Sequence, residues 1–266
     1  MAFGPDNRFQ QSGSAWAQPF GRSAAVDAAQ LDEGLRAYML RVYNWMASGL
    51  LLTGIVAYLI ANTGAAELFY QVVRTPRGNA VSPTILGWVA MFAPLVFILV
   101  LSFGINRMSK TTAQALFWAF CAVMGASMAN IFAIYTATSI ASTFFITAAM
   151  FGATSLYGYT TKADLTRMGT FMMMGLIGIM LASIVNIFIG SSALQFAISV
   201  MGVVIFVGLT AYDTQRIKAD YIEYAYAEGT ELAGKRSVFD ALGLYLNFIN
   251  LFQFMLQFMG VRQNSD

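Results

Sequence analysis

The chain has 266 residues, of which 58% are hydrophobic and only 11% are charged, with a mean hydropathy of +0.63. Soluble domains carry about 25% charged residues, so this composition is typical of a membrane protein, and the net charge of +2 is too small to indicate a nucleic-acid partner. The chain has no histidine, which excludes Ser-His and Cys-His catalysis and His-ligated metals, and its one cysteine cannot form an internal disulfide. We therefore expect neither an enzyme nor a bound cofactor.

Residues 1–36 are predicted to be a flexible cytoplasmic tail. Residues 1–29 are rich in Gly, Ser, Gln and Ala and show no sustained apolar periodicity. They do not have the basic start and apolar core of a cleaved signal peptide. We therefore expect the first span, which begins near Val42, to direct membrane insertion.

Residues 37–266 are predicted to form an all-α transmembrane domain of seven helices. Each apolar segment has about 20 residues, the length that a helix needs to cross about 30 Å of hydrocarbon. Short polar turns make the third and fourth spans, and the fifth and sixth, adjacent and antiparallel. The predicted spans are 42–61, 84–105, 112–135, 138–159, 169–190, 193–213 and 239–260.

The seventh span is the least apolar, and it carries a stripe of amides. Asn250, Gln253 and Gln257 fall on one side of a helix, and Asn247 extends that stripe. Amide side chains on a membrane helix should face protein or water rather than lipid. The stripe therefore predicts that the last helix is central in the bundle.

The basic residues near the spans predict the orientation. With the N-terminus inside, eleven Lys and Arg residues lie on the cytoplasmic side and three on the other. The C-terminus is then outside if the seventh segment crosses fully, and cytoplasmic if that segment enters and returns. The eleven are Arg22, Arg36, Arg41, Arg107, Lys110, Lys162, Arg167, Arg216, Lys218, Lys235 and Arg236, and the three are Arg74, Arg77 and Arg262.

Asp213 is the main functional candidate, because a carboxylate at the edge of a membrane span is costly unless it faces protein or water. It lies about 20 residues into the sixth segment, near the expected cytoplasmic boundary. The alternative is an exposed helix-end ion pair with Arg216, three residues on, which would have little consequence. Composition and spacing do not separate these two interpretations.

Asp240 has a simpler structural interpretation. The run Ser237-Val238-Phe239-Asp240 matches a capping box, in which a serine begins a helix and an acidic residue follows three positions later. The pattern predicts that the seventh helix begins here.

Four segments together resemble the Bax inhibitor-1 family of membrane proteins, in its bacterial branch. The resemblance covers about residues 34 to 260, and its most specific parts are the Tyr212-Asp213-Thr214-Gln215 motif and the last helix. The four segments are 34–43, 143–160, 212–215 and 244–252.

The resemblance implies a pH-sensitive calcium leak across the bacterial inner membrane. Family members hold two aspartates together near the cytoplasmic mouth, and these positions correspond to Asp213 and Asn247 here. Asn247 departs from the pattern and removes the repulsion that makes two carboxylates share a proton, so the proton switch should be weakened or moved. Asp213 stays a candidate Ca²⁺ ligand, with Arg216, Asp240 and Asn250 as candidate supporting residues.

Two functions are therefore open. One is a cation or Ca²⁺ leak gated at Asp213. The other is a regulator without transport that binds membrane proteins, since some bacterial relatives modulate a membrane-bound AAA protease. In that case the N-terminal tail could serve as the handle for the protease. The lipid bilayer is the expected partner in both cases.

Overall fold

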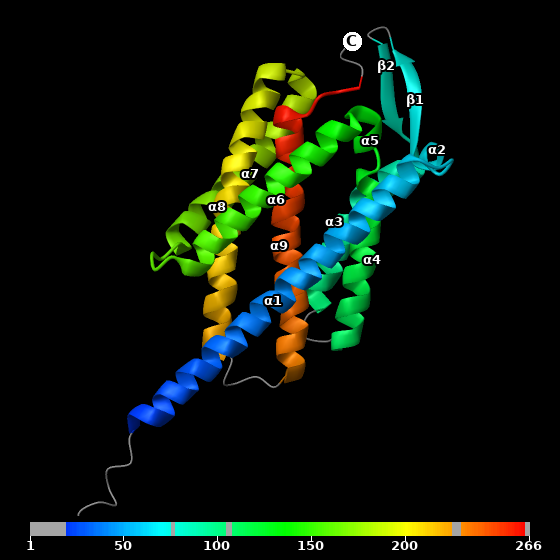
Figure 1. Ribbon diagram of the computed structural model, residues 1–266. Coiled ribbons are helices and arrows are strands. Elements are labelled where there is room, and N and C mark those ends of the chain that lie inside the picture. Colours follow the sequence, from blue (N-terminus) through cyan, green and yellow to red (C-terminus); the bar gives the residue numbers. More distant parts are fainter. Residues whose placement is uncertain (1–19, 76–77, 105–107, 225–229, 264–266) are drawn as a thin grey trace, which may run out of the picture.

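The computed structural model describes residues 20–75, 78–104, 108–224 and 230–263, which are mostly helical (Figure 1). The long helices are α1 (Phe20–Ala61), α3 (Ile85–Gly104), α4 (Lys110–Met128), α6 (Ala137–Thr160), α7 (Thr166–Ile189), α8 (Ser192–Tyr224) and α9 (Thr230–Met259). The short elements are helices α2 (Ala66–Phe69) and α5 (Ile131–Ile134) and strands β1 (Tyr70–Thr75) and β2 (Gly78–Pro83).

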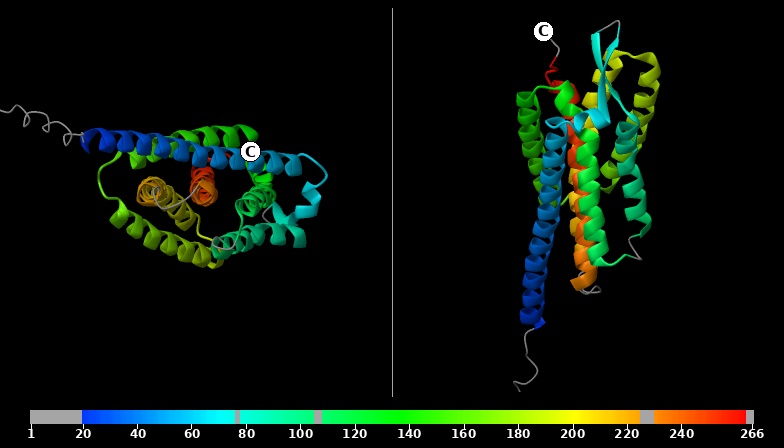
Figure 2. Two further views of the ribbon diagram at one scale, coloured as in Figure 1. Left: turned by 90° about the horizontal axis from the view of Figure 1, so that it is seen from below. Right: turned by 90° about the vertical axis from the view of Figure 1, so that its right-hand side faces the viewer.

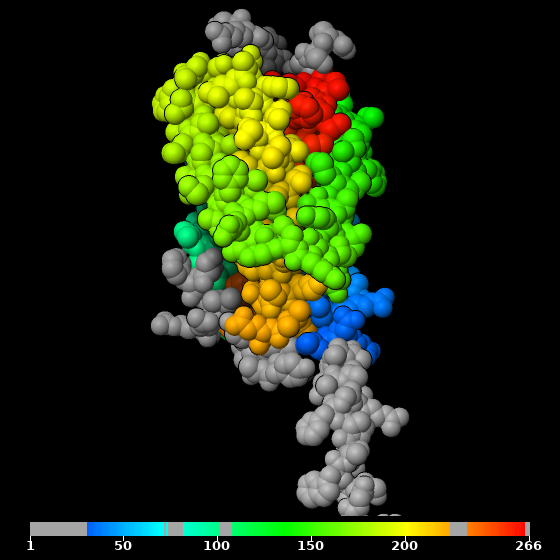
Figure 3. Space-filling view, turned by 90° about the vertical axis from the view of Figure 1, so that its left-hand side faces the viewer, coloured from blue at the N-terminus to red at the C-terminus, as the bar shows by residue number. Residues whose placement is uncertain are grey.

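Each predicted span corresponds to one of the long helices, which confirms the all-α membrane fold. Six helical stretches are long and apolar enough to cross a bilayer, and α3 supplies a shorter apolar stretch, Ile85–Leu101. Apolar side chains also cover the outside of the bundle. Phe188 on α7, for example, is 84% exposed, as expected for a side chain that faces lipid. Much of the face in Figure 3 is made by α7 and its neighbours.

Helix α9 is the centre of the bundle, as the amide stripe predicts. It packs against α1, α4, α6 and α8, and the views of Figure 2 show it enclosed by them. Of its apolar stretch 61% is buried, against 11% for α7. The large side chains of Tyr245, Leu244 and Leu251 on α9 are fully buried in the core.

The last helix also crosses the bundle completely. Its 30 residues form one unbroken helix about 45 Å long, more than the hydrocarbon thickness. The start of α1 and the end of α9 consequently lie at opposite ends of the molecule (Figure 1). A segment that enters and returns is not what the structure shows.

Three helices are longer than their predicted spans. Helix α1 begins at Phe20, so residues 20–36, predicted as tail, are helical, while residues 1–19 of the predicted tail lie outside the described part of the chain. Helix α8 continues eleven residues beyond Asp213, and α9 begins at Thr230 instead of residue 239. Hydropathy marks only the part of a helix within lipid, whereas Ala, Leu, Glu, Gln and Lys continue a helix into water.

A β-hairpin joins α2 to α3 and was not predicted. Strands β1 and β2 pair antiparallel, with Val72 opposite Val81. The hydroxyl of Tyr70 donates to the carbonyl oxygens of Ala126 and Ser127 on α4, at 3.1 Å each. These bonds attach the hairpin to the end of the bundle at which α9 ends (Figure 1).

Candidate functional site

The Tyr212-Asp213-Thr214-Gln215 motif lies inside α8 rather than at its end. Successive residues of a helix are about 100° apart, so four in a row point to four sides. The four side chains accordingly contact α7, α9, α6 and the loop that precedes α7, in chain order. The motif therefore places α8 against its neighbours as well as supplying the acid.

Asp213 is held from two sides. The Nδ2 of Asn247 on α9 donates to Asp213 Oδ2 at 2.6 Å, and an Arg216 guanidinium nitrogen lies 3.1 Å from Asp213 Oδ1. The side chain of Asp213 is 15% exposed, that of Arg216 is 46% exposed, and Asn247 is buried. The pairing with Arg216 and the contact across α8 and α9 thus occur together, and the carboxylate is mostly enclosed.

Thr214 continues the site into α6 and α1. Its hydroxyl shares a hydrogen bond of 2.9 Å with that of Ser155 on α6. Ser155 also contacts the hydroxyl of Tyr43 on α1, at 2.5 Å. Three hydroxyl groups therefore connect three helices beside Asp213.

Tyr212 packs against α7, and Gln215 forms hydrogen bonds with the loop that precedes α7. Gln215 Oε1 accepts from the backbone N–H of Leu165 at 2.8 Å, and its Nε2 donates to the carbonyl of Ala163 at 2.7 Å. The ring of Tyr212 lies so close to Gly169 that a Cβ there would come within 2.4 Å of it. Only glycine allows α7 to approach α8 in this way.

The prediction that Asp240 caps the start of the last helix is wrong. Helix α9 begins at Thr230, and the hydroxyl of Ser237 donates to the carbonyl of Gly234 inside the helix, at 2.8 Å. Asp240 instead accepts a hydrogen bond of 2.5 Å from the hydroxyl of Tyr38 on α1. The residue therefore connects α1 to α9 near the site, and it also interacts electrostatically with Arg216.

The other amides of the stripe do not converge on Asp213. Asn250 donates from Nδ2 to the carbonyl of Leu246 in its own helix, at 2.8 Å. Gln257 accepts from Gln195 and Ser199 on α8, at 2.8 and 3.3 Å, near the opposite end of the bundle. Two residues of the stripe, Asn247 and Gln257, therefore bond α9 to α8 near opposite ends of the bundle, and of these amides Asn247 is the one that contacts the acid.

Sequence reasoning missed Tyr38, Tyr43 and Ser155. A signal was present on α6, where Ser139, Thr143, Thr147 and Ser155 recur at multiples of four residues and are all buried. Such spacing places hydroxyl groups on one side of a helix. The two tyrosines lie in one of the segments that carry the family resemblance, but their partners lie 112 and 202 residues away.

The site does not fit a resident metal ion. Ca²⁺ takes six to eight oxygen ligands, and Asp213 and Asn247 supply few. Within the described ranges, no three Cys, Asp or Glu side chains gather closely enough to hold a metal.

Comparison with known proteins decides the family. The family model described as "Inhibitor of apoptosis-promoting Bax1" matches residues 35–264. The chain belongs to the Bax inhibitor-1 family. The match covers the same part of the chain as the resemblance seen in the motifs, and it includes Asp213 and the whole of α9.

Curated relatives agree with this membership in the Bax inhibitor-1 family. The chain is similar to Inner membrane protein YbhL of Escherichia coli strain K12, with 45% identity over 244 residues, 92% of this chain and 99% of the relative. A protein of Caulobacter vibrioides is 47% identical over 91% of this chain and 96% of its own length. A membrane protein of Streptococcus pyogenes is 32% identical over 231 residues, which make up 87% of this chain and 95% of the relative.

Proposed function

We propose that this Bax inhibitor-1 family member is a passive cation leak of the bacterial inner membrane, with Ca²⁺ as the expected ion and Asp213 at the gate. The observation that carries the proposal is the enclosed Asp213 carboxylate, held between α8 and α9 by Asn247. An enclosed charge within a membrane helix is costly and is by default a candidate functional site, and ion paths are among the roles that such residues serve. The name of the relative YbhL supports the inner membrane.

The present arrangement corresponds to a closed gate. Arg216 and Asn247 occupy both oxygens of Asp213, and the amide presents its nitrogen rather than its oxygen. A cation must replace these two partners to reach the carboxylate. Opening therefore requires α8 and α9 to separate locally or the Asn247 amide to turn.

Protonation of Asp213 gives the gate its pH dependence. A neutral carboxyl group loses the ion pair with Arg216, which is also near Asp240 on α9 and stacks over Tyr212 at 5.9 Å. Loss of this ion pair then weakens the contacts that hold Asp213 in the closed arrangement. We expect the leak to increase as pH falls, and to do so at a lower pH than in a site with two carboxylates, because Asn247 adds no like charge that would favour protonation of Asp213.

Flux into proteoliposomes tests the leak itself. Liposomes that contain only this protein and a Ca²⁺ indicator should admit Ca²⁺ faster than empty liposomes, and more so at pH 6 than at pH 8. Parallel measurements with K⁺ establish whether the path prefers Ca²⁺. A rate equal to that of empty liposomes at every pH would contradict the proposal.

A second candidate is a regulator without transport, which binds a membrane protease. The observation that favours it is the length of α1, whose first turns extend beyond the neighbouring helices at one end of the bundle (Figure 1). With the N-terminus in the cytoplasm, as the basic residues predict, this extension would be accessible to a soluble protease domain. The absence of flux together with co-purification of an AAA protease would favour this candidate.

A further inference from the structure

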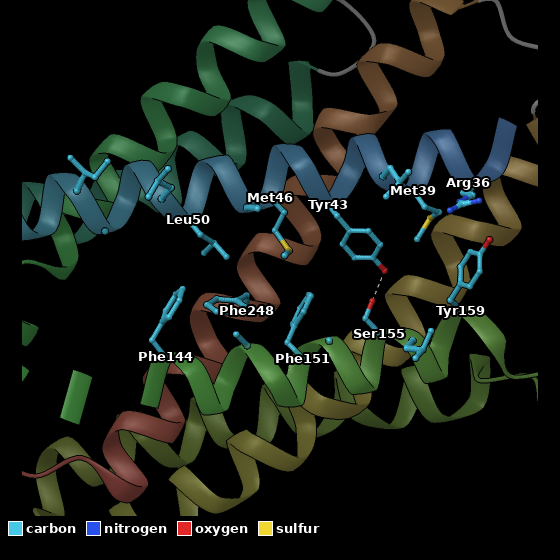
Figure 4. Close-up of a pocket in the computed structure, with 18 of the residues that line it drawn as sticks. Arg36, Met39, Tyr43, Met46, Leu50, Phe144, Phe151, Ser155, Tyr159 and Phe248 are labelled. Carbon is cyan, nitrogen blue, oxygen red and sulfur yellow. Dashed lines mark hydrogen bonds between the residues drawn. The ribbon is translucent and has the colours of Figure 1, made fainter. Parts of the chain in front are cut away.

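A large groove opens on the side of the bundle between α1 and α6. Its volume is about 1180 Å³, and Phe248 of α9 forms part of its floor (Figure 4). Both walls pack on α9, and the hydrogen bond between Tyr43 and Ser155 joins them across the groove. Ordinary ligand pockets measure about 300–1,000 Å³, so this groove suits a long occupant.

The lining has a polar end and a long apolar part. Arg36 and Tyr159 lie at one end of the view in Figure 4, and Tyr43 and Ser155 face each other nearer its middle. Beyond them the walls are apolar as far as Tyr58, with Met46, Leu50, Leu51, Ile55, Phe144 and Phe151 among the lining side chains. This gradient matches a molecule with a polar head and a hydrocarbon tail.

The polar end is also basic. Arg36 is exposed and, among the described side chains, makes no ion pair with a carboxylate. Lys218 of α8 donates to the carbonyl of Tyr159 at 2.9 Å and lies 4.9 Å from the centre of the Tyr159 ring. A head group that bears a negative charge is therefore favoured over a neutral one.

The groove has the position and length that a lipid requires. Its polar end lies toward the start of α1 and the end of α6, at the same end of the bundle as Lys162 in the α6–α7 connection. From Arg36 to Gly54, both in its lining, α1 rises about 27 Å, which exceeds the roughly 15 Å of one leaflet. A head group at the membrane surface can therefore place its acyl chain fully within the groove.

We propose that this groove is a binding site for a phospholipid with an anionic head group, whose phosphate contacts Arg36 and whose acyl chain lies along α1 and α6. An inserted peptide segment would fit less well, because its backbone N–H and C=O groups would meet apolar walls without partners. A phospholipid has no such groups along its tail. The site does not depend on the proposed leak.

Two glycines allow the groove to be filled deliberately. Gly54 on α1 and Gly152 on α6 both line it, and a Cβ added at either position would meet no atom within 4 Å. A tryptophan at Gly152 should therefore occupy the groove without disturbing the helices. Gly178 on α7 is equally open but lies outside the groove, so Gly178→Trp is a matched control.

Native mass spectrometry of the purified full chain tests the site. The protein is incubated with dioleoyl phosphatidylglycerol or with dioleoyl phosphatidylcholine, and the lipids retained after activation are counted. We expect one firmly retained phosphatidylglycerol per protein and much less phosphatidylcholine. Arg36→Gln should lower phosphatidylglycerol retention about tenfold, since one charge-assisted contact with its phosphate is lost, and should narrow the difference in retention from phosphatidylcholine.

Gly152→Trp should abolish retention of both lipids, while Gly178→Trp should behave as the parent. Gly54→Leu repeats the test from the other wall if Gly152→Trp fails to fold. The proposal would be overturned if the parent, Arg36→Gln, Gly152→Trp and Gly54→Leu all retained the two lipids equally. The retained lipid would then be nonspecific boundary lipid. A lipid-free dimer that Gly152→Trp converts to a monomer would also overturn it, because a second copy of the chain would then be the occupant.

Discussion

Asp213 combines two contacts that would have different consequences alone. The ion pair with Arg216 is a local contact within α8, of the kind that contributes little at an exposed surface. The bond from Asn247 comes from another helix and encloses the carboxylate. Because both act on one side chain, a change of its charge affects a contact between helices, which a surface ion pair would not do.

Asn247→Asp should create the pair of acids that the family resemblance implies. Two carboxylates at one enclosed site share a proton and titrate together. We expect Ca²⁺ flux into proteoliposomes to depend more steeply on pH, between about pH 5 and 8, than in the parent. Asn250→Asp is the control, since Asn250 bonds to its own helix one turn away and should leave the slope unchanged. Parent-like slopes in both variants would argue against a role for position 247.

The helices approach most closely where glycines allow it. Gly158 on α6 faces the backbone of α8 so closely that an added Cβ would lie 2.2 Å from the carbonyl oxygen of Ala211. Backbone atoms cannot turn aside as a flexible side chain can. This contact lies next to the Tyr212–Gln215 motif, so the position of the motif depends on it.

Gly158→Ala should therefore be destabilising, by about 1–3 kcal/mol, because α6 and α8 must separate to admit the methyl group. Gly152→Ala, in the same helix, is the control, since its Cβ would meet open space. Thermal unfolding in detergent should show a clearly lower Tm for Gly158→Ala and a Tm near that of the parent for Gly152→Ala. Equal Tm values would mean that α6 and α8 do not pack as closely as described.

At the scale of the whole molecule, the sequence was sufficient for the seven spans and the central last helix. Apolar length determines the spans, and the amides of residues 247–257 indicate a buried helix. Helix ends were less predictable, because hydropathy does not register the polar turns of α1, α8 and α9. The Tyr38–Asp240 contact depends on packing between residues 202 positions apart, which no local pattern reveals.

The orientation of the bundle remains a prediction from the basic residues, and reporter fusions test it. Fusions after Lys110, Lys162 and Lys235 should all report the cytoplasm. A fusion at Asp266 should report the opposite side, because α9 crosses the bundle without a break. A periplasmic signal from any of the first three would contradict the proposed orientation.

The most direct test of the leak compares the parent with Asp213→Asn in Ca²⁺ flux at pH 6 and pH 8. The amide keeps the shape of the side chain but cannot change its charge. The parent should admit more Ca²⁺ at pH 6 than at pH 8, and Asp213→Asn should show the same flux at both. Identical pH dependence in the two proteins, or flux no greater than that of empty liposomes, would contradict a gate at Asp213.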